Sequence, residues 1–270
     1  MTSIDWSIIG DPRALGESGL FVAEGRLVLD RLLDLRAAGA GWDLVGVLAS
    51  PAAVHALHLD ERCGSLLDVR PPGDMQRMTG FNFHRGVIAL VRRPPIQTLD
   101  AWLGGLPSTP PLVLAEHIVD VDNVGSIFRN ARALGAAGVL LDDASADPLY
   151  RKAVRTSMGA VLDLPWTMGA RAPAWAAVRA AGYRLLALTP AADAVPLRDA
   201  LTSLGHGGLA IVVGNEGTGL SADALDACGI PARIPMDEGA DSLNVATALA
   251  IALYETQRAR EQSRSRSMPT

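Results

Sequence analysis

The stretch Ile211-Val-Val-Gly-Asn-Glu-Gly-Thr-Gly-Leu220 decides the fold of this 270-residue chain. A continuous apolar run, typical of a buried strand, leads directly into a loop that holds three glycines. Strands of this kind belong to parallel sheets covered by helices, and ligands bind such sheets at the carboxyl ends of the strands. We therefore expect an α/β domain with a ligand site at this loop; a tight glycine turn without a ligand is the alternative.

The glycine loop is a poor match for a phosphate-binding loop. Its order Gly214-x-x-Gly217-x-Gly219 reverses the dinucleotide-binding spacing, and the Gly-Lys-Ser/Thr ending of a P-loop is absent. A carboxylate at Glu216 would also repel a pyrophosphate. The expected ligand is therefore neutral or cationic overall, as an adenosyl compound with a sulfonium centre is. A nucleotide-dependent oxidoreductase is the less favoured alternative.

Strand-like and helix-like stretches alternate on both sides of this loop. The predicted strands are Leu112–Ala115, Gly138–Leu141, Arg184–Leu188, Leu209–Val213 and Arg233–Ile234, and the predicted helices are 124–134, 150–158, 173–181 and 243–258. Such alternation is typical of an α/β fold with a mostly parallel sheet that helices cover on both faces.

Residues 1–93 form a separate, smaller α/β domain in this interpretation. Its predicted elements are a helix from Phe21 to about Ala38, a strand at Asp43–Leu48, a helix that begins near Pro51, and strands at Leu66–Val69 and Gly86–Val91. Prolines and glycines at 94–111 predict a linker to the main domain, residues 112–260. The polar, Arg- and Ser-rich tail 261–270 is predicted to be disordered and is a weak candidate for a contact with RNA.

Composition excludes several classes of protein and leaves others open. The net charge of −5 does not favour nucleic-acid binding, but a charge sum cannot reveal a local basic patch. Cys63 and Cys228 lie far apart without metal-ligand spacing, so we expect reduced thiols, no metal site and no disulfide. No apolar stretch is long enough to span a bilayer, and the N-terminus does not resemble a secretory signal. These features predict a cytoplasmic protein without a membrane partner.

A second polar segment is Asp122-Asn-Val-Gly-Ser-Ile-Phe-Arg-Asn-Ala-Arg132, which follows the strand predicted at 112–115. Asn123 is expected to cap the helix, and Gly125 allows another backbone or a ligand to approach closely. Arg129 lies away from the apolar stripe of the helix. A capped helix with solvated arginines is the alternative to a functional site.

A third segment runs from Ile234-Pro-Met to Tyr254 and contains Ser242-Leu-Asn-Val245. Asp241 or Ser242 is expected to cap a long helix, and Asn244 in its first turn can reach a ligand. The helix carries small apolar residues on nearly all sides, so it must pack on the sheet, on a partner subunit, or on both.

In this order, the three segments resemble the motifs of the SpoU/TrmH-type RNA ribose methyltransferases of the SPOUT superfamily. That family has Asn-x-Gly-x-x-x-Arg, Gly-Asn-Glu-Gly-x-Gly-Leu and Ile-Pro-Met…Ser-Leu-Asn-Val, and the resemblance covers residues 112–256, including Tyr150–Ala160. Residues 20–92, with Ala23-Glu-Gly25 and His84-Arg-Gly-Val87, resemble the family's substrate-binding domain, which is similar to ribosomal protein L30e. Ala246 departs from the family, since many relatives carry serine there.

The resemblance implies a deep trefoil knot and transfer of a methyl group from S-adenosylmethionine to a ribose 2′-hydroxyl of RNA. Ribosomal RNA is favoured over transfer RNA because of the separate L30e-like domain, and a homodimer is implied. The implied cofactor-binding residues are Leu188, Thr189, Gly214, Asn215, Gly217, Ile234, Met236 and Leu243; the implied catalytic residues are Arg129, Asn123, Glu216, Ser242 and Asn244. No metal is implied.

Arg129 is the residue expected to carry the chemistry. Because arginine does not deprotonate in proteins, we expect it to hold the substrate phosphate and stabilise the developing alkoxide while the proton leaves to phosphate or water. Glu216 is expected to orient Arg129 through an ion pair. Base methylation and a non-catalytic RNA-binding role remain alternatives, because a fold does not determine the target atom.

Overall fold

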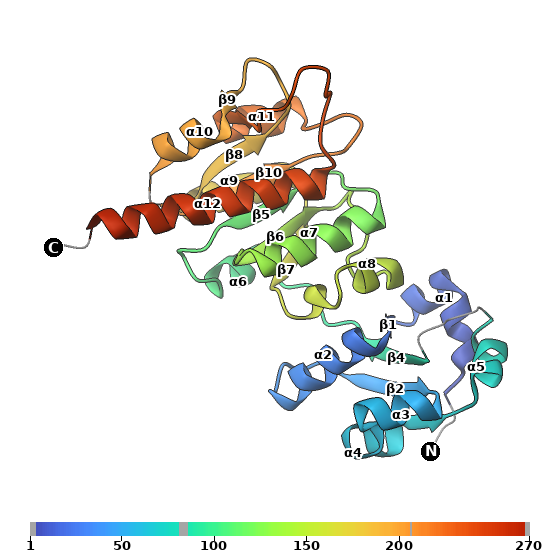
Figure 1. Cartoon of the computed structure of the whole chain (residues 1–270). Helices are drawn as coiled ribbons and strands as arrows, with labels where there is room; N and C mark the ends of the chain where they lie inside the picture. The colour runs from blue at the N-terminus through green and yellow to red at the C-terminus, as the bar shows by residue number, and fades with distance from the viewer. Residues whose placement is uncertain (1–3, 81–85, 206, 268–270) are drawn as a thin grey trace. The chain divides into compact units, whose positions relative to one another are not determined.

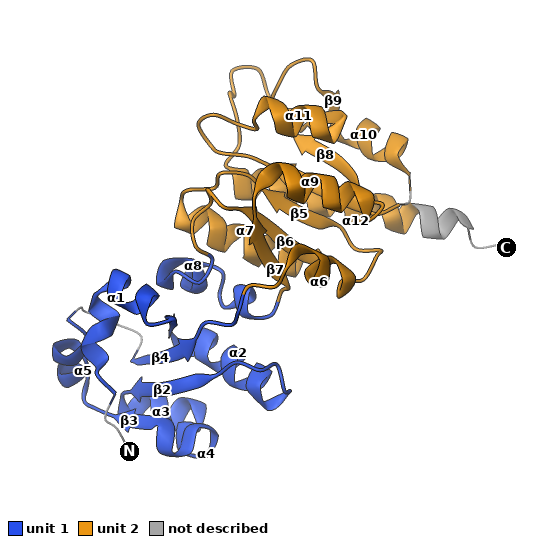
Figure 2. Cartoon of the chain, turned by 180° about the vertical axis from the view of Figure 1, so that it is seen from behind, with its two compact units in different colours: residues 1–95, 148–163 blue, residues 96–147, 164–270 orange. Residues whose placement is uncertain are grey.

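The computed structural model describes residues 4–80, 86–205 and 207–267, and the chain forms two compact units (Figure 2). Unit 1 comprises Met1–Pro95 and Pro148–Asp163; unit 2 comprises Ile96–Asp147 and Leu164–Thr270. These bounds differ from the predicted ones, because residues 148–163 belong to the smaller unit.

Unit 2 is built on a seven-stranded sheet whose strand order is β7-β6-β5-β10-β8-β11-β9 (Figure 1). The strands are β5 Leu112–Ala115, β6 Gly138–Asp142, β7 Trp166–Gly169, β8 Arg184–Leu188, β9 Val195–Pro196, β10 Leu209–Val213 and β11 Ile230–Arg233. Each neighbouring pair is parallel, which confirms the predicted α/β fold with a mostly parallel sheet. The prediction missed β7 and β9, and the strand predicted at Arg233–Ile234 begins earlier, at Ile230.

Helices cover both faces of this sheet (Figures 1 and 2). On one face lie α6 Leu99–Gly104, α9 Arg171–Ala180 and α11 Ala222–Cys228; on the other lie α7 Val121–Ala133, α10 Leu197–Leu204 and α12 Val245–Ser267. Successive side chains of a strand point to opposite faces. Accordingly Leu112 and Leu114 of β5 pack in a core with Trp175 and Val178 of α9.

The segment 94–111 is not the linker that its prolines and glycines predicted. It contains α6, which Thr98 caps, and Trp102 of this helix is 1% exposed in the core of unit 2. Gly138 makes room for Trp102, since a Cβ atom there would lie 2.8 Å from the indole ring. The proline and glycine residues therefore bound a short packed helix.

Unit 1 contains a four-stranded sheet in the order β1-β4-β2-β3, with β4 antiparallel to both neighbours and β2 parallel to β3. Its strands are β1 Leu20–Glu24, β2 Leu44–Ala49, β3 Leu67–Val69 and β4 Val87–Arg92; its helices are α1 Pro12–Glu17, α2 Arg26–Ala37, α3 Pro51–Leu57, α4 Leu59–Cys63, α5 Pro72–Thr79 and α8 Arg151–Thr156, with short 3-10 turns η1 Trp6–Gly10, η2 Gly64–Leu66 and η3 Ala160–Leu162. The L30e-like character of this unit stays a prediction, and His84 and Arg85 lie outside the described residues.

The helix predicted from Phe21 is wrong in its first turn. Residues 21–24 form part of β1, where Phe21, Val22 and Ala23 are fully buried, and the chain turns at Gly25 with φ +102° before α2 begins. A non-glycine residue rarely adopts such a backbone angle. Apolar residues buried on both faces of a strand do not show the alternation that distinguishes a strand from a helix.

Helix α12 begins and ends later than predicted. It starts at Val245 instead of 243 and continues to Ser267, so residues 261–267, predicted to be disordered, are helical. Arg, Glu and Gln extend a helix at little cost once it is nucleated. Cys63 and Cys228 are both buried and form no disulfide, and burial raises the pKa of the Cys228 thiol to about 12. The implied trefoil knot stays a prediction.

Candidate cofactor cavity at the carboxyl ends of the strands

A cavity of about 440 Å³ opens at the carboxyl ends of β8, β10 and β11. Small-molecule sites have volumes of this order, roughly 300–1,000 Å³. The residues predicted to bind the cofactor all line it: Leu188, Thr189, Gly214, Asn215, Gly217, Ile234, Met236 and Leu243. Two of the predicted catalytic residues, Glu216 and Ser242, line it as well. The predicted binding residues, which come from three separate loops, therefore meet at a single cavity.

The lining of the cavity selects against phosphate. Among the described residues that line it, none is basic, and Glu216 is the charged one. The walls are largely apolar, with Leu220, Leu225, Met236 and Val245 beside backbone amides and carbonyls of the loops. A phosphate would find a carboxylate and no cation there, whereas a neutral or cationic ligand with an apolar ring system fits the walls.

The loop after β10 is folded by the side chain of Asn215. Its Oδ1 accepts hydrogen bonds from the backbone N–H groups of Gly217 at 2.8 Å and Thr218 at 3.0 Å, and its Nδ2 donates to the carbonyl of His117 at 3.0 Å. Gly214 lets the loop close on itself, since a Cβ atom there would lie 2.7 Å from the backbone of Gly219. The sequence predicted that Asn215 contacts the ligand; in the structure its polar atoms shape the loop.

A chain of side-chain hydrogen bonds joins the three predicted motifs at the edge of the cavity. Asn244 Nδ2 donates to Asn123 Oδ1 at 2.8 Å, and Asn123 Nδ2 donates to Glu216 Oε1. The three residues come from the start of α12, the first turn of α7 and the loop after β10. Nothing in the packing of the sheet requires this arrangement, so it supports a functional role for all three.

Both predicted helix caps are corrected by the structure. Asp120 caps α7 by accepting from the backbone of Asp122 at 2.8 Å, which leaves the amide of Asn123 for Glu216 and Asn244. Asn244 caps α12, because its Oδ1 accepts from the backbone of residues 246 and 247 at 3.0 and 3.2 Å. Asp241 and Ser242, the predicted caps, both lie before the helix. A single side chain, Asn244, therefore both caps α12 and takes part in the hydrogen-bonded chain Glu216–Asn123–Asn244, which is called the polar chain below.

Arg129 does not take part in this group of hydrogen-bonded side chains. Its side chain is exposed on α7, it does not line the cavity, and no ion pair with Glu216 occurs within residues 4–80, 86–205 and 207–267. The predicted Glu216–Arg129 pair is thus replaced by the Glu216–Asn123 hydrogen bond. On the helix, Asn123 and Asn130 lie seven positions apart and share a face, and Asn130 donates to the carbonyl of Ala246 at 2.8 Å. That face is directed at α12, whereas Arg129 is directed to solvent.

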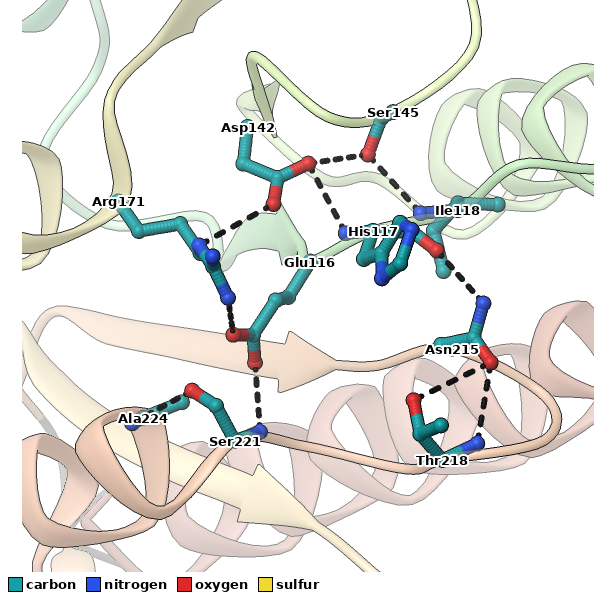
Figure 3. Close-up of polar contacts among 10 residues, drawn as sticks. All are labelled: Glu116, His117, Ile118, Asp142, Ser145, Arg171, Asn215, Thr218, Ser221 and Ala224. Atoms are coloured by element: carbon teal, nitrogen blue, oxygen red, sulfur yellow. Dashed lines mark hydrogen bonds and ion pairs between the residues drawn. The ribbon is translucent and has the colours of Figure 1, made fainter.

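The sequence analysis missed a charged cluster behind the cavity (Figure 3). Glu116, which follows β5, and Asp142, the last residue of β6, are 1% and 0% exposed. Arg171 donates to Glu116 at 2.7 Å and lies 3.6 Å from Asp142. The detectable signal was an acidic residue at the end of each of two apolar strands, since a buried carboxylate at such a position needs a partner.

The described part of the chain shows neither a metal site nor a membrane-spanning helix. Within it, no group of three or more histidine, cysteine, aspartate or glutamate side chains has the arrangement of a metal site. None of the described helices combines the length and hydropathy of a membrane span.

Comparison with known proteins identifies the family to which the site belongs. A model of the SpoU rRNA methylase family matches residues 110–254. A protein named as an uncharacterised tRNA/rRNA methyltransferase of Mycobacterium bovis is 40% identical, over 88% of this chain and 81% of its own length. A 23S rRNA (guanosine-2′-O-)-methyltransferase of a Burkholderia species is 30% identical, over 76% of this chain and 82% of its own.

A solved structure extends the likeness to nearly the whole chain. The SpoU methyltransferase AviRb of Streptomyces viridochromogenes, in complex with the cofactor S-adenosylmethionine, superposes with a TM-score of 0.78 at 26% identity. The superposition covers 96% of this chain and 98% of that one.

Proposed function

The chain belongs to the SpoU rRNA methylase family and is an RNA methyltransferase with S-adenosylmethionine as its cofactor, and we propose that it methylates a ribose 2′-hydroxyl of ribosomal RNA. The observation that carries the proposal is the hydrogen-bonded chain Glu216–Asn123–Asn244 at the edge of the cavity. A relative named for 2′-O-methylation of 23S rRNA supports both the target atom and the RNA class.

The residues of the cavity fit the cofactor. Gly214, Ile234 and Leu243 offer backbone groups and apolar walls to an adenosyl moiety, and Glu216 favours a positively charged centre nearby. When bound, S-adenosylmethionine supplies an electrophilic methyl group on its sulfonium. Leu188, Thr189, Asn215, Gly217 and Met236 complete the proposed binding set.

The reaction requires that the protein hold and polarise the ribose 2′-hydroxyl, which is a poor nucleophile. Ser242 and Asn244 position the ribose or the cofactor carboxylate, and the Glu216–Asn123–Asn244 chain fixes the orientation of both amides. Arg129 is exposed, so it is available to an RNA phosphate; there it stabilises the developing alkoxide while the proton leaves to phosphate or water. A homodimer belongs to the proposal, because Tyr254 on α12 is 52% exposed and its apolar ring would be buried by a second copy.

Mapping of ribose methylation tests the proposed function. Total RNA from a strain that lacks the gene should lose 2′-O-methylation at one ribosomal RNA position, and wild-type protein should restore it. Loss of a transfer RNA site would overturn the proposed substrate, and loss of a base methylation would overturn the target atom. No lost methylation, together with no binding of S-adenosylmethionine at high micromolar concentration, would favour a non-catalytic RNA-binding protein.

Substitutions of Asn244 separate its two roles. Asn244→Asp should keep α12 capped, because a carboxylate accepts from the same two backbone N–H groups and is favoured at a helix N-terminus. Asn244→Ala should lower the free energy of unfolding by about 1 kcal/mol. Both variants lose the donor to Asn123, so both should methylate RNA about tenfold more slowly. Denaturant unfolding and single-turnover kinetics measure the two effects; an Asn244→Asp variant with wild-type kinetics would exclude the hydrogen-bonded chain from the reaction.

A further inference from the structure

Two buried carboxylates in unit 2 share one cation. Glu116 and Asp142 are almost completely buried, and Arg171, the first residue of α9, is the arginine that pairs with both among the described residues (Figure 3). A buried carboxylate is costly unless a cation and hydrogen bonds compensate its lost hydration. The hydrogen bond and the charge of Glu116, followed by the charge of Asp142, raise the pKa of Arg171, so the guanidinium stays protonated.

Each carboxylate also holds one end of the loop 214–220. Glu116 Oε2 accepts from the backbone N–H of Ser221 at 3.1 Å, where the loop ends and α11 begins. Asp142 Oδ1 accepts from the backbone N–H of His117 at 2.9 Å, and the carbonyl of His117 accepts from Asn215, where the loop begins. Figure 3 shows the two branches running from Arg171 to the two ends of the loop. The loop itself forms a wall of the cavity.

Hydrogen bonds hold the backbone around His117 in an unusual conformation. His117 has φ +55°, a conformation that non-glycine residues adopt only when their surroundings hold them there. Ser145 Oγ strengthens this branch, because it donates to Asp142 Oδ1 at 2.6 Å and accepts from the backbone of Ile118 at 3.0 Å. The cluster therefore fixes backbone positions after β5 and β10 at once.

We propose that Arg171 is a positioning residue for cofactor binding, which acts through Glu116 and Asp142 to hold the loop 214–220 in its binding shape. Arg171 does not line the cavity, so any effect of its loss on the cofactor passes through the two carboxylates. The inference rests on the proposed placement of S-adenosylmethionine in this cavity.

Four variants of the full chain test this role: Arg171→Gln, Arg171→Lys, Glu116→Gln and the double variant of Arg171→Gln with Glu116→Gln. Titration calorimetry with S-adenosylmethionine measures affinity, and amide hydrogen exchange measures the loop directly. Arg171→Gln should weaken binding by roughly tenfold to a hundredfold and should speed exchange at Gly217 and Thr218. Arg171→Lys keeps the charge but loses the planar fork that reaches both carboxylates, so its loss should be smaller.

The double variant distinguishes positioning from simple stability. The neutral amide that Glu116→Gln introduces would still accept from Ser221 but would need no cation. The double variant should therefore bind the cofactor on the order of tenfold more tightly than Arg171→Gln alone. Val178→Ala provides the matched control, because truncating this fully buried residue of α9 lowers stability while Arg171 and both carboxylates stay unchanged. That control should keep wild-type affinity and loop exchange.

Each outcome decides one claim. A folded Arg171→Gln protein with wild-type affinity and exchange would overturn the role of Arg171, as would equal losses in Val178→Ala. If Arg171→Gln does not fold, Arg171→Lys and the double variant provide the same comparison. If the wild-type protein does not bind S-adenosylmethionine, the placement of the cofactor fails, while loop exchange still decides whether Arg171 holds the loop.

Discussion

We expect Arg129→Ala to lower the rate of RNA methylation by about a hundredfold to a thousandfold and to leave cofactor affinity and thermal stability unchanged. A loss of rate without a loss of affinity or stability is expected because the side chain is exposed on α7 and lies outside the cavity. Removing it exposes no core and vacates no cofactor contact, whereas the developing alkoxide loses a guanidinium. Single-turnover methylation with labelled cofactor, titration calorimetry and thermal unfolding measure the three quantities.

Arg179→Ala is the control for loss of a positive charge. Arg179 is an exposed arginine on α9, which covers the opposite face of the sheet from α7. Its loss should change the methylation rate less than about twofold, since an exposed charge far from the site contributes little to it. An Arg129→Ala enzyme that retains near-normal activity on a verified RNA would remove Arg129 from the reaction, and one that loses cofactor affinity would place the side chain in a binding role instead.

Gly214→Ala should weaken the binding of S-adenosylmethionine by about tenfold to a hundredfold. The new methyl group would lie 2.7 Å from the carbonyl of Gly219 and 2.8 Å from the backbone nitrogen of Leu220. Backbone atoms cannot move aside as a flexible side chain can, so the loop must open, and overpacking of this kind costs about 1–3 kcal/mol. Calorimetric titration measures the loss of affinity.

Gly104→Ala provides the comparison for a glycine without a close neighbour. A Cβ atom at this position in α6 would meet no heavy atom within 4 Å, and alanine favours a helix. This variant should bind the cofactor as the wild-type protein does. If Gly214→Ala bound S-adenosylmethionine with wild-type affinity, the close approach of Gly214 to Gly219 would not be needed for cofactor binding.

Periodicity and composition predicted most of unit 2, because its strands are short, continuously apolar and separated by helices. Continuous burial on both faces also made β1 resemble the start of a helix, since Phe21, Val22 and Ala23 carry no alternation. The short helix α6 was missed for a different reason. Its packing depends on Trp102 fitting against Gly138, a contact between residues that local sequence cannot pair.

At the candidate site, the lining residues were predictable from motif order, but their connections were not. Asn123 and Asn244 could each cap a helix by their residue type alone, and only the tertiary structure shows that Asp120 frees Asn123 for the polar chain. Arg171 carried no signal, because an arginine at the start of a helix is ordinarily solvated. Its role depends on the carboxylates of Glu116 and Asp142, which lie 55 and 29 positions earlier in the sequence.

The hydrogen bonds that close the cavity join residues far apart in the sequence: Asn215 and His117 are 98 positions apart, Ser221 and Glu116 are 105, and Asn244 and Asn123 are 121. Contacts of such long range form slowly, because a long segment of chain must be ordered before any of them can stabilise it. During synthesis, the segments before residue 214 can collapse locally, but the polar chain cannot close until Asn244 has left the ribosome. A nascent chain therefore lacks the complete cavity, and on the proposed placement of S-adenosylmethionine it can bind the cofactor only once almost the whole of unit 2 has been made.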